Sequence, residues 1–284
     1  MRIALAQMAP LLGDVAKNWD LHRKLWEKAR RAKADLLVFP ELSLTGYKLR
    51  DLVETVTEDP ARSARFKELR SMSRALPLVV GFVEESRNEK GLFFNAAAFL
   101  AGGRLIHVHR KVFLPTFGMF EEGRFFAPGG HFGSFATPFG PAGLMICRDF
   151  LHLNSGYLLF AGGAEILITI SAAPGRGLGV AKGFASSRMW ELMGETLARF
   201  TTSVVVYCNR VGMEDGMAFA GGSFVFAPDG RLAAQAPYFE EALLLVDIDP
   251  DGVRKARKSW PWKRDDKPEV TLASLQRILL RHDH

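Results

Sequence analysis

Cysteine is scarce in this chain, with only Cys147 and Cys208 among its 284 residues. Two cysteines are too few for a disulfide framework, and they lack the paired spacing of a zinc site. Long apolar runs are also missing, because glycine, proline or charge interrupts each run before it reaches the ~18–20 residues that a bilayer span requires. The sequence therefore argues against a disulfide-stapled or membrane-spanning protein, and each cysteine is judged by its own surroundings.

Low-complexity linkers and short-period repeats are absent from the sequence as well. The 48% hydrophobic content is that of a globular protein, so we expect one domain over residues 1–250. The first ten residues, MRIALAQMAP, hold too brief an apolar stretch for a secretory signal and are typical of a first strand. We therefore expect a cytoplasmic protein.

The net charge of +6 is unevenly distributed, since residues 251–284 hold nine Lys and Arg against five Asp and Glu. The cluster RKARK at 254–258 has no aromatic residues between its charges, unlike a typical nucleic-acid surface. This pattern predicts a basic C-terminal tail that is solvated or contacts a protein partner, and it argues against nucleic-acid binding.

Apolar runs of β-type composition alternate with segments of helical period along the chain. The strand-like runs include RIALAQM, ADLLVFP, LPLVVGFVEE, EILITI and SVVVYCN, and the expected helices cover residues 18–33, 61–76 and 180–200, with a further one before Gly162. Turn signals predict hairpins at Gly102 and Gly103, at Gly140 and Pro141, and over 228–230. Two β-sheets covered on the outside by helices would bury these runs.

Cys147 ends the strand-like run GLMIC, and Arg148 and Asp149 follow it at once. The carboxyl end of a strand is where α/β folds usually place ligands. A free thiol, whose pKa lies near ~8.5, needs a nearby base or positive charge to act as a nucleophile. Cysteine is also a common core residue, so this segment alone is compatible with a nucleophile or with a packed side chain. Asp149 fits a turn-fixing role, and Cys208 fits a packed thiol.

Histidine is the usual partner of a cysteine nucleophile, and a Cys-His enzyme could recruit His107, His109, His131 or His152. None of these stands in a recognisable sequence context. His107 and His109 alternate along one strand-like run and could bind a metal, but a third ligand is not close to them in the sequence. We therefore expect no metal site.

Two other segments carry charge at strand ends. Glu41 follows an apolar run and Pro40 in LLVFPELSLTGY, where a partly buried carboxylate could serve as a general base. Lys111, in HRKVFLPTFGMFEEGRFF, precedes a loop of proline, glycine and aromatic residues that could wall a small pocket. Taken singly, Glu41 could cap a helix and Lys111 could be a solvated charge.

Together these segments resemble the carbon–nitrogen hydrolase family, also called the nitrilase superfamily, whose catalytic Glu, Lys and Cys occur in this order. FPELSLTGY matches the glutamate motif, HRKVFLP the lysine motif and GLMICRDF the cysteine motif, and NRVGMEDGMAFAGGS at 209–223 is a fourth shared block. The resemblance extends from RIALAQM to about residue 247. The additional glutamate of the family aligns with Glu122 rather than with Glu121.

The resemblance implies an α/β fold, a four-layer α-β-β-α sandwich, in which Glu41, Lys111 and Cys147 converge. The resemblance also implies a catalytic mechanism. Glu41 would take the thiol proton, Cys147 would attack the amide carbon, and Lys111 with the backbone N–H of Arg148 would stabilise the oxyanion. Glu122 would orient Lys111 or the leaving group. Water would then hydrolyse the thioester, and neither a metal nor an organic cofactor is required.

The residues after the nucleophile favour amide over nitrile hydrolysis, because true nitrilases of the family follow the cysteine with Trp-Glu, whereas this chain has Arg148 and Asp149. For contacts with the substrate we expect Tyr47 and Phe117, with Arg148 and Arg176 as charge-assisted partners of a carboxylate. The predicted substrate is a small primary amide that carries a carboxylate.

Several segments look most like the glutaminase portion of glutamine-dependent NAD synthetases and their stand-alone relatives. The chain could hydrolyse a small amide alone, or it could supply ammonia to a separate synthetase. A binding protein on an inactivated hydrolase scaffold is the alternative from another class. Because family members commonly pair their sandwiches, we expect a homodimer or higher oligomer, with the 251–284 tail, including Trp260 and Trp262, packed across the interface.

Overall fold

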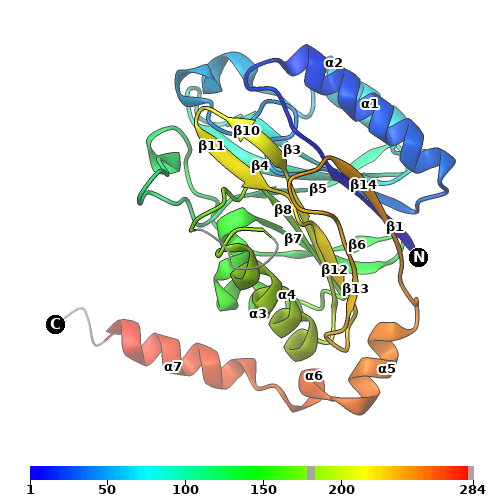
Figure 1. The fold of residues 1–284 in the computed structure, drawn as a ribbon. Coiled ribbons are helices and arrows are strands. Elements are labelled where there is room, and N and C mark those ends of the chain that lie inside the picture. Colours follow the sequence, from blue (N-terminus) through cyan, green and yellow to red (C-terminus); the bar gives the residue numbers. More distant parts are fainter. Residues whose placement is uncertain (178–182, 281–284) are drawn as a thin grey trace.

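Two six-stranded sheets form the centre of the molecule (Figure 1). The computed structural model describes residues 1–177 and 183–280. The first sheet has the order β14-β1-β2-β3-β4-β5, with strands β1 (Arg2–Gln7), β2 (Leu36–Val38), β3 (Leu78–Glu85), β4 (Phe93–Ala101), β5 (Arg104–Arg110) and β14 (Ala242–Asp247). The second has the order β13-β12-β9-β8-β7-β6, with strands β6 (Ser134–Thr137), β7 (Gly140–Ile146), β8 (Ile166–Ser171), β9 (Val204–Asn209), β12 (Phe224–Phe226) and β13 (Leu232–Gln235).

Helices cover the outer face of each sheet. The first sheet carries α1 (Val15–Arg31) and α2 (Ala64–Met72), and the second carries α3 (Leu153–Ala161) and α4 (Ser187–Thr201). Short 3₁₀ turns are η1 (Arg50–Val56), η2 (Glu122–Arg124) and η3 (Cys147–Leu151), and a separate hairpin joins β10 (Val211–Glu214) to β11 (Met217–Ala220). The layers run helix, sheet, sheet, helix, so the predicted α-β-β-α sandwich is confirmed.

The alternation of side chains along β1 explains why its apolar run is continuous. Ile3 and Leu5 point into the core between the two sheets, whereas Ala4 and Ala6 point toward α1 and α2. Successive strand residues face opposite sides of a sheet, and here both sides are buried. Full burial of an aliphatic side chain of the size of leucine is worth about 1.5–3 kcal/mol, so both layers of contacts stabilise this sheet.

Most elements match the sequence-based expectation, with two differences. The hairpin turn expected at Gly140 and Pro141 lies two residues earlier, because both residues belong to β7. The Thr137 hydroxyl fixes this turn by accepting from the Phe139 N–H and donating to the Gly140 carbonyl. The helix expected over 180–200 begins at Ser187, and the start of the expected range, 180–182, lies outside the described residues.

The C-terminal tail contains three helices, α5 (Gly252–Ser259), α6 (Trp262–Asp265) and α7 (Pro268–Leu280). Figure 1 shows α5 near the β12–β13 hairpin, α6 beside α4 and α7 extending away from the body of the molecule. α7 has no buried residue. None of the helices described is both long and apolar enough to cross a membrane.

Candidate active site

Three reactive side chains lie at the ends of strands or within three residues of them. Glu41 comes shortly after β2, Lys111 immediately after β5, and Cys147 immediately after β7. β2 and β5 belong to the first sheet and β7 to the second. The structure brings these residues together, because Lys111 bonds Glu41 directly and the charges of both act on the Cys147 thiol. The cluster therefore lies where the ends of the two sheets meet.

Lys111 is the centre of the cluster. Its Nζ donates to Oε1 of Glu41 at 2.7 Å and to Oε1 of Glu122 at 2.7 Å. The exposed fractions of Lys111, Glu41 and Glu122 are 0%, 1% and 6%. These bonds use two of the three ammonium protons, and the third can face a reacting oxygen. Glu121, by contrast, pairs with Lys48 and is more exposed, so Glu122 is the glutamate that belongs to the site.

Two further groups fix the Glu41 carboxylate. The Asn95 amide donates to Oε1 at 2.7 Å, and the backbone N–H of Ala172 donates to Oε2 at 2.6 Å. Neither contact was predicted from the sequence. Asn95 interrupts the apolar strand β4, and a polar residue within a buried apolar run could have indicated a functional contact. Ala172 contributes only its backbone, so its side chain gave no signal.

Burial and charge shift the acid–base behaviour of the cluster. Burial opposes the charged form of Lys111, but the carboxylates of Glu122 and Glu41 outweigh it and hold the pKa of the ammonium above its ordinary value. Burial raises the pKa of Glu122 to about 7, with Lys111 opposing and Glu41 adding to the shift. Lys111 is therefore a permanent cation, and Glu122 titrates near neutral pH.

Cys147 has an unusual backbone conformation at the first position of η3. Its φ is +45°, in the left-handed region that a non-glycine residue seldom adopts. The side chain is 6% exposed. Burial, followed by the Glu41 carboxylate, raises the pKa of the thiol, and Lys111 opposes this only in part. The resting thiol is protonated, so attack on a substrate requires a base to remove that proton.

Asp149 ties the cysteine turn to the lysine loop. Its Oδ1 accepts from the backbone N–H groups of Val112 at 3.1 Å and Phe113 at 2.9 Å. Its Oδ2 accepts from the Ile146 N–H at 3.0 Å and pairs with His109 Nε2 at 2.9 Å. The expected turn-fixing role of Asp149 is thus present, and the aspartate additionally links the two sheets beside Lys111 and Cys147.

The four residues expected to contact a substrate lie in different environments. Tyr47 is buried and its hydroxyl donates to Glu122 Oε1 at 2.6 Å, so its polar end belongs to the carboxylate cluster. Phe117 is 42% exposed. The guanidinium carbons of Arg148 and Arg176 lie 5.1 Å and 5.5 Å from the centre of the Phe117 ring. The structure therefore gathers Phe117 and the two arginines into one cationic aromatic group.

Three of the four histidines considered as partners of the nucleophile, which included His131, have other contacts. His109 bonds Asp149, His107 stacks on Phe135, and His152 stacks on Phe113. Among the described residues, no cluster of three His, Cys, Asp or Glu side chains is arranged to hold a metal ion. Cys208 is fully buried between the sheets, as expected of a packed thiol.

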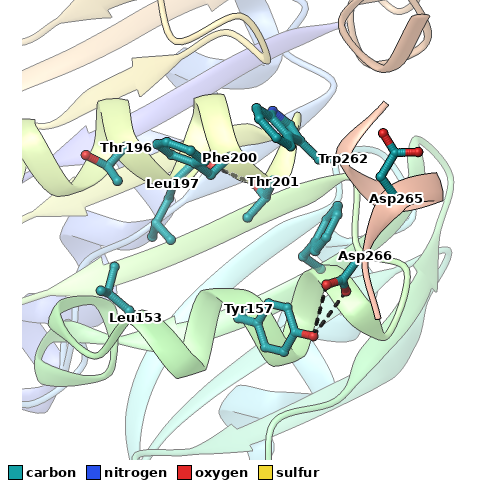
Figure 2. Close-up of a pocket in the computed structure, with 10 residues that line it drawn as sticks. Leu153, Tyr157, Thr196, Leu197, Phe200, Thr201, Trp262, Asp265 and Asp266 are labelled. Atoms are coloured by element: carbon teal, nitrogen blue, oxygen red, sulfur yellow. Dashed lines mark hydrogen bonds between the residues drawn. The ribbon is translucent and has the colours of Figure 1, made fainter. Parts of the chain in front are cut away.

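One cavity among the described residues is lined by none of the residues of this cluster. It has a volume of about 600 Å³ and is lined by residues of α3, α4 and α6 (Figure 2). Its walls are mainly apolar, and the Tyr157 hydroxyl bonds Asp266 at its edge. We place the active site at the buried ion cluster instead, because the cavity lining contains neither a cysteine nor a lysine.

Comparison with known proteins agrees with this geometry. The sequence model of the family described as carbon-nitrogen hydrolase matches residues 2–258. A glutamine-dependent NAD(+) synthetase from Acinetobacter baylyi is 31% identical over 248 residues, which cover 87% of this chain and 44% of the relative. The chain thus spans less than half the length of that relative.

Solved structures with similar folds include proteins of comparable length. A carbon–nitrogen hydrolase from Helicobacter pylori is 26% identical with a TM-score of 0.81, and the match covers 97% of this chain and 98% of that protein. An amidase from Nesterenkonia sp. is 25% identical with a TM-score of 0.74 and covers 92% and 96%. The matched family model and the shared fold confirm the prediction from the three motifs: the chain belongs to the carbon–nitrogen hydrolase family and is a hydrolase.

Proposed function

We propose that the protein hydrolyses the C–N bond of a small amide through a thioester on Cys147. The observation that carries this proposal is the buried Glu41–Lys111–Glu122 cluster, whose charges act on the Cys147 thiol. A protonated nucleophile beside a fixed carboxylate and a permanent cation is the arrangement that acyl transfer requires.

In the first step, a carboxylate oxygen of Glu41 takes the thiol proton while Sγ of Cys147 attacks the amide carbon. The carbonyl oxygen gains negative charge, and the third proton of Lys111 Nζ and the backbone N–H of Arg148 stabilise it. The C–N bond then breaks, and the proton held by Glu41 passes to the leaving nitrogen. Ammonia or an amine departs, and the acyl group remains on sulfur.

In the second step, Glu41 takes a proton from a water molecule that attacks the thioester carbon. The C–S bond breaks, the proton returns to sulfur, and a carboxylic acid is released. Every atom of the amide and of the water is accounted for, and the enzyme regains its starting state. The amide, water and the side chains of the protein supply all the atoms of both steps.

Glu122 has a free oxygen suited to the leaving group. Its Oε1 receives bonds from Lys111 and Tyr47, whereas its buried Oε2 has no hydrogen-bond partner among the described residues. A buried acceptor without a donor costs desolvation free energy, and an N–H group of the substrate would supply the missing hydrogen bond. Glu122 therefore both orients Lys111 and holds the amide nitrogen.

The preferred substrate is a small primary amide that carries a carboxylate. Arg148 and Arg176 both lie against the Phe117 ring, and Arg148 directly follows the nucleophile in the chain. A guanidinium group binds a carboxylate through paired, charge-assisted hydrogen bonds. The ring would pack against the carbon chain of the substrate while one or both arginines bind its charged end.

A role as an ammonia-supplying subunit is the second candidate. It is supported by the similarity to glutamine-dependent NAD(+) synthetases, of which the chain covers less than half. This candidate predicts that glutamine is the best substrate and that a separate synthetase increases its turnover. The simple amidase predicts turnover of a small amide that no partner changes.

The deciding experiment is a screen of amides, N-carbamoyl compounds, glutamine and nitriles, scored by ammonia release and by intact-protein mass spectrometry after rapid acid quench. The proposal expects release from an amide and a Cys147 adduct equal to the substrate mass minus ammonia. A protein that releases no ammonia, and whose Cys147 does not react with iodoacetamide near neutral pH, would instead be a binding protein on this scaffold.

We further propose that residues 251–284 are a tail distinct from the 1–250 hydrolase domain and that a second copy of the chain covers it. α7 exposes at least half of each of six apolar residues, which are Val270, Leu272, Leu275, Ile278, Leu279 and Leu280. The outer helices of the second sheet expose apolar side chains of their own, which are Leu153, Leu158, Met189, Leu192 and Phe200. An unpartnered apolar helix and an apolar helical face in one chain can cover each other in a symmetric dimer.

A further inference from the structure

A buried ion pair lies in the β10-β11 hairpin, within the segment NRVGMEDGMAFAGGS. Arg210 precedes β10 and Glu214 ends it, and their exposed fractions are 1% and 6%. The guanidinium of Arg210 donates to Oε2 of Glu214 and, at 3.2 Å, to the Pro10 carbonyl. Neither side chain takes part in the chemical steps proposed above, so the pair needs another explanation.

Glu214 binds the loop that carries Tyr47. Its Oε1 accepts from the backbone N–H of Tyr47 at 2.9 Å and from that of Lys48 at 2.7 Å. Bonds from two N–H groups to one charged oxygen are stronger than neutral ones. Gly46 permits this approach, because its φ is +82° and a Cβ there would lie 2.9 Å from Oε2 of Glu214. The backbone conformation at Gly46 therefore lets the N–H groups of Tyr47 and Lys48 both reach the Glu214 carboxylate.

The Tyr47 side chain connects this loop to the cluster around Lys111. Its hydroxyl donates to Glu122 Oε1 at 2.6 Å, the same oxygen that Lys111 Nζ bonds at 2.7 Å. Phe219 of β11 packs edge-on against the Tyr47 ring at 5.9 Å and also lies under the Arg210 guanidinium at 4.2 Å. The hairpin thus fixes Tyr47 at its backbone through Glu214 and at its ring through Phe219.

We propose that Glu214, held by Arg210, is a positioning residue that sets the Tyr47 hydroxyl so that Glu122 stays against Lys111. This inference rests on the proposed function, since amide turnover is its main readout. Arg210 neutralises the charge of Glu214, which is buried away from water. Its guanidinium also contacts the ring of Phe219, on which Tyr47 packs. The hairpin acts on the reaction through the chain Glu214, Tyr47, Glu122, Lys111 and touches no substrate itself.

The first test compares single and double variants in the full-length protein. Glu214→Leu and Tyr47→Phe should each lower kcat for the best amide by about tenfold and change KM by less than about threefold, as expected when an interaction made in the transition state is lost. Combining them should lower kcat no further than the more damaging single change, because both remove one connection. Effects on kcat that multiply would overturn the proposal.

A conservative pair of changes tests the hydrogen bonds apart from the charge. Arg210→Met together with Glu214→Gln removes both charges and keeps a carbonyl oxygen that can accept from Tyr47 and Lys48. This double variant should retain several times the kcat of Glu214→Leu. Equal loss in the two would mean that the acceptor does not position Tyr47, and the proposal would be wrong.

Asp215→Asn is the matched control, since Asp215 lies in the same hairpin and its side chain is 41% exposed. It should leave kcat within about twofold of wild type. Thermal unfolding and circular dichroism measure the folded fraction, so loss of folded protein is not mistaken for loss of positioning. A kcat decrease in Glu214→Leu that disappears when rates are expressed per folded site would overturn the proposal.

Failure of the proposed function can be recognised separately. If the wild-type protein hydrolyses no amide, the rate of Cys147 alkylation by iodoacetamide replaces kcat, because it needs no substrate and responds to the charges around the thiol. Glu214→Leu and Tyr47→Phe should then change this rate by the same factor, and Asp215→Asn should leave it unchanged. Different factors for the first two variants would contradict the positioning role.

Discussion

Lys111 and Glu41 are 70 positions apart in the chain, yet Nζ of the lysine lies 2.7 Å from Oε1 of the glutamate. Both side chains are fully buried. Removing one partner of a buried ion pair leaves the other charge without water or counterion, which is more damaging than replacing both. The same bond therefore matters for stability and, in the proposed mechanism, for the reaction.

Lys111→Met should abolish ammonia release and lower the free energy of unfolding by about 3–5 kcal/mol, because Glu41 and Glu122 remain buried without their cation. Urea unfolding followed by circular dichroism measures the stability. Lys255→Met is the control, since Lys255 forms an ion pair with Asp249 on the surface, and it should leave the unfolding curve unchanged. Equal stability of the two variants would contradict a role of Lys111 as the buried counterion.

Cys147→Ala and Cys147→Ser should each reduce amide turnover by at least about 10³-fold, since no other group can form the thioester. Cys208→Ala should keep turnover and lower the free energy of unfolding by about 1–2 kcal/mol, because it only removes a packed thiol. Ammonia release and circular dichroism distinguish these effects. Loss of turnover in all three variants, with folding intact, would show that Cys147 is not the sole nucleophile.

The pH dependence should report Glu122, whose pKa burial raises from 4.5 to about 7. Lys111, Glu41 and Tyr47 are the ionisable groups that act on it. A carboxyl group whose pKa is higher in the folded state loses stability on ionisation. The free energy of unfolding should therefore fall as pH rises from about 4.5 to about 7, and Glu122→Gln should flatten this slope.

The same titration should appear in kcat/KM, which should rise with pH through about 7 as Glu122 ionises. The Tyr47 hydroxyl favours the charged form of Glu122, so Tyr47→Phe should move this rise to higher pH. A rise that keeps its position in Tyr47→Phe, or that persists in Glu122→Gln, would assign it to another group.

Arg148→Ala and Arg176→Ala test the carboxylate preference. At least one of them should lower kcat/KM for the best acidic amide by about tenfold while sparing a neutral analogue, as expected for loss of a charge-assisted contact. Arg124→Ala is the control, because Arg124 lies in the same loop as Phe117 and pairs with Glu121 on the surface. If both variants stay within about threefold of wild type, which is less than ~1 kcal/mol, the acidic-amide preference loses its basis.

The tail should govern assembly and leave the chemistry unchanged. Leu275→Lys, which places charge on the apolar side of α7, should reduce the molar mass in light scattering at micromolar concentration, whereas the neighbouring change Gln276→Lys should not. Turnover per folded site should stay within about twofold in both, because α7 has no buried residue and carries none of the proposed catalytic side chains. A wild-type protein that is strictly monomeric would refute the proposed interface.

The sequence predicted the layers of the fold because most of the buried strands are largely apolar runs between turn signals. It did not predict the turn after β6, because this turn depends on how one threonine hydroxyl meets two backbone groups. Local patterns report which segments are buried. They do not report which side chain closes a particular turn.

The same limit applies to the candidate site. Glu41, Lys111 and Cys147 stand at strand ends and in family motifs, so their convergence was predictable. The Ala172 N–H that fixes Glu41 comes from the residue that follows β8 of the other sheet, and it has no side-chain signature. His109 drew attention as a base or ligand, and the structure gives it Asp149 as a partner instead. Such contacts depend on the packing of the two sheets, which no local pattern encodes.

β1 pairs with β14 along its whole length, from Arg2↔Asp247 to Gln7↔Ala242. A ribosome delivers the chain from its N-terminus, so β1 leaves the exit tunnel long before its partner strand is synthesised. Until then, one edge of β1 presents unpaired N–H and C=O groups beside apolar side chains, which is a surface that chaperones and aggregating neighbours bind. The first sheet, and the lysine and glutamate that it carries, can reach their final arrangement only after residue 247 has emerged, and the nascent chain is most vulnerable in the interval before that.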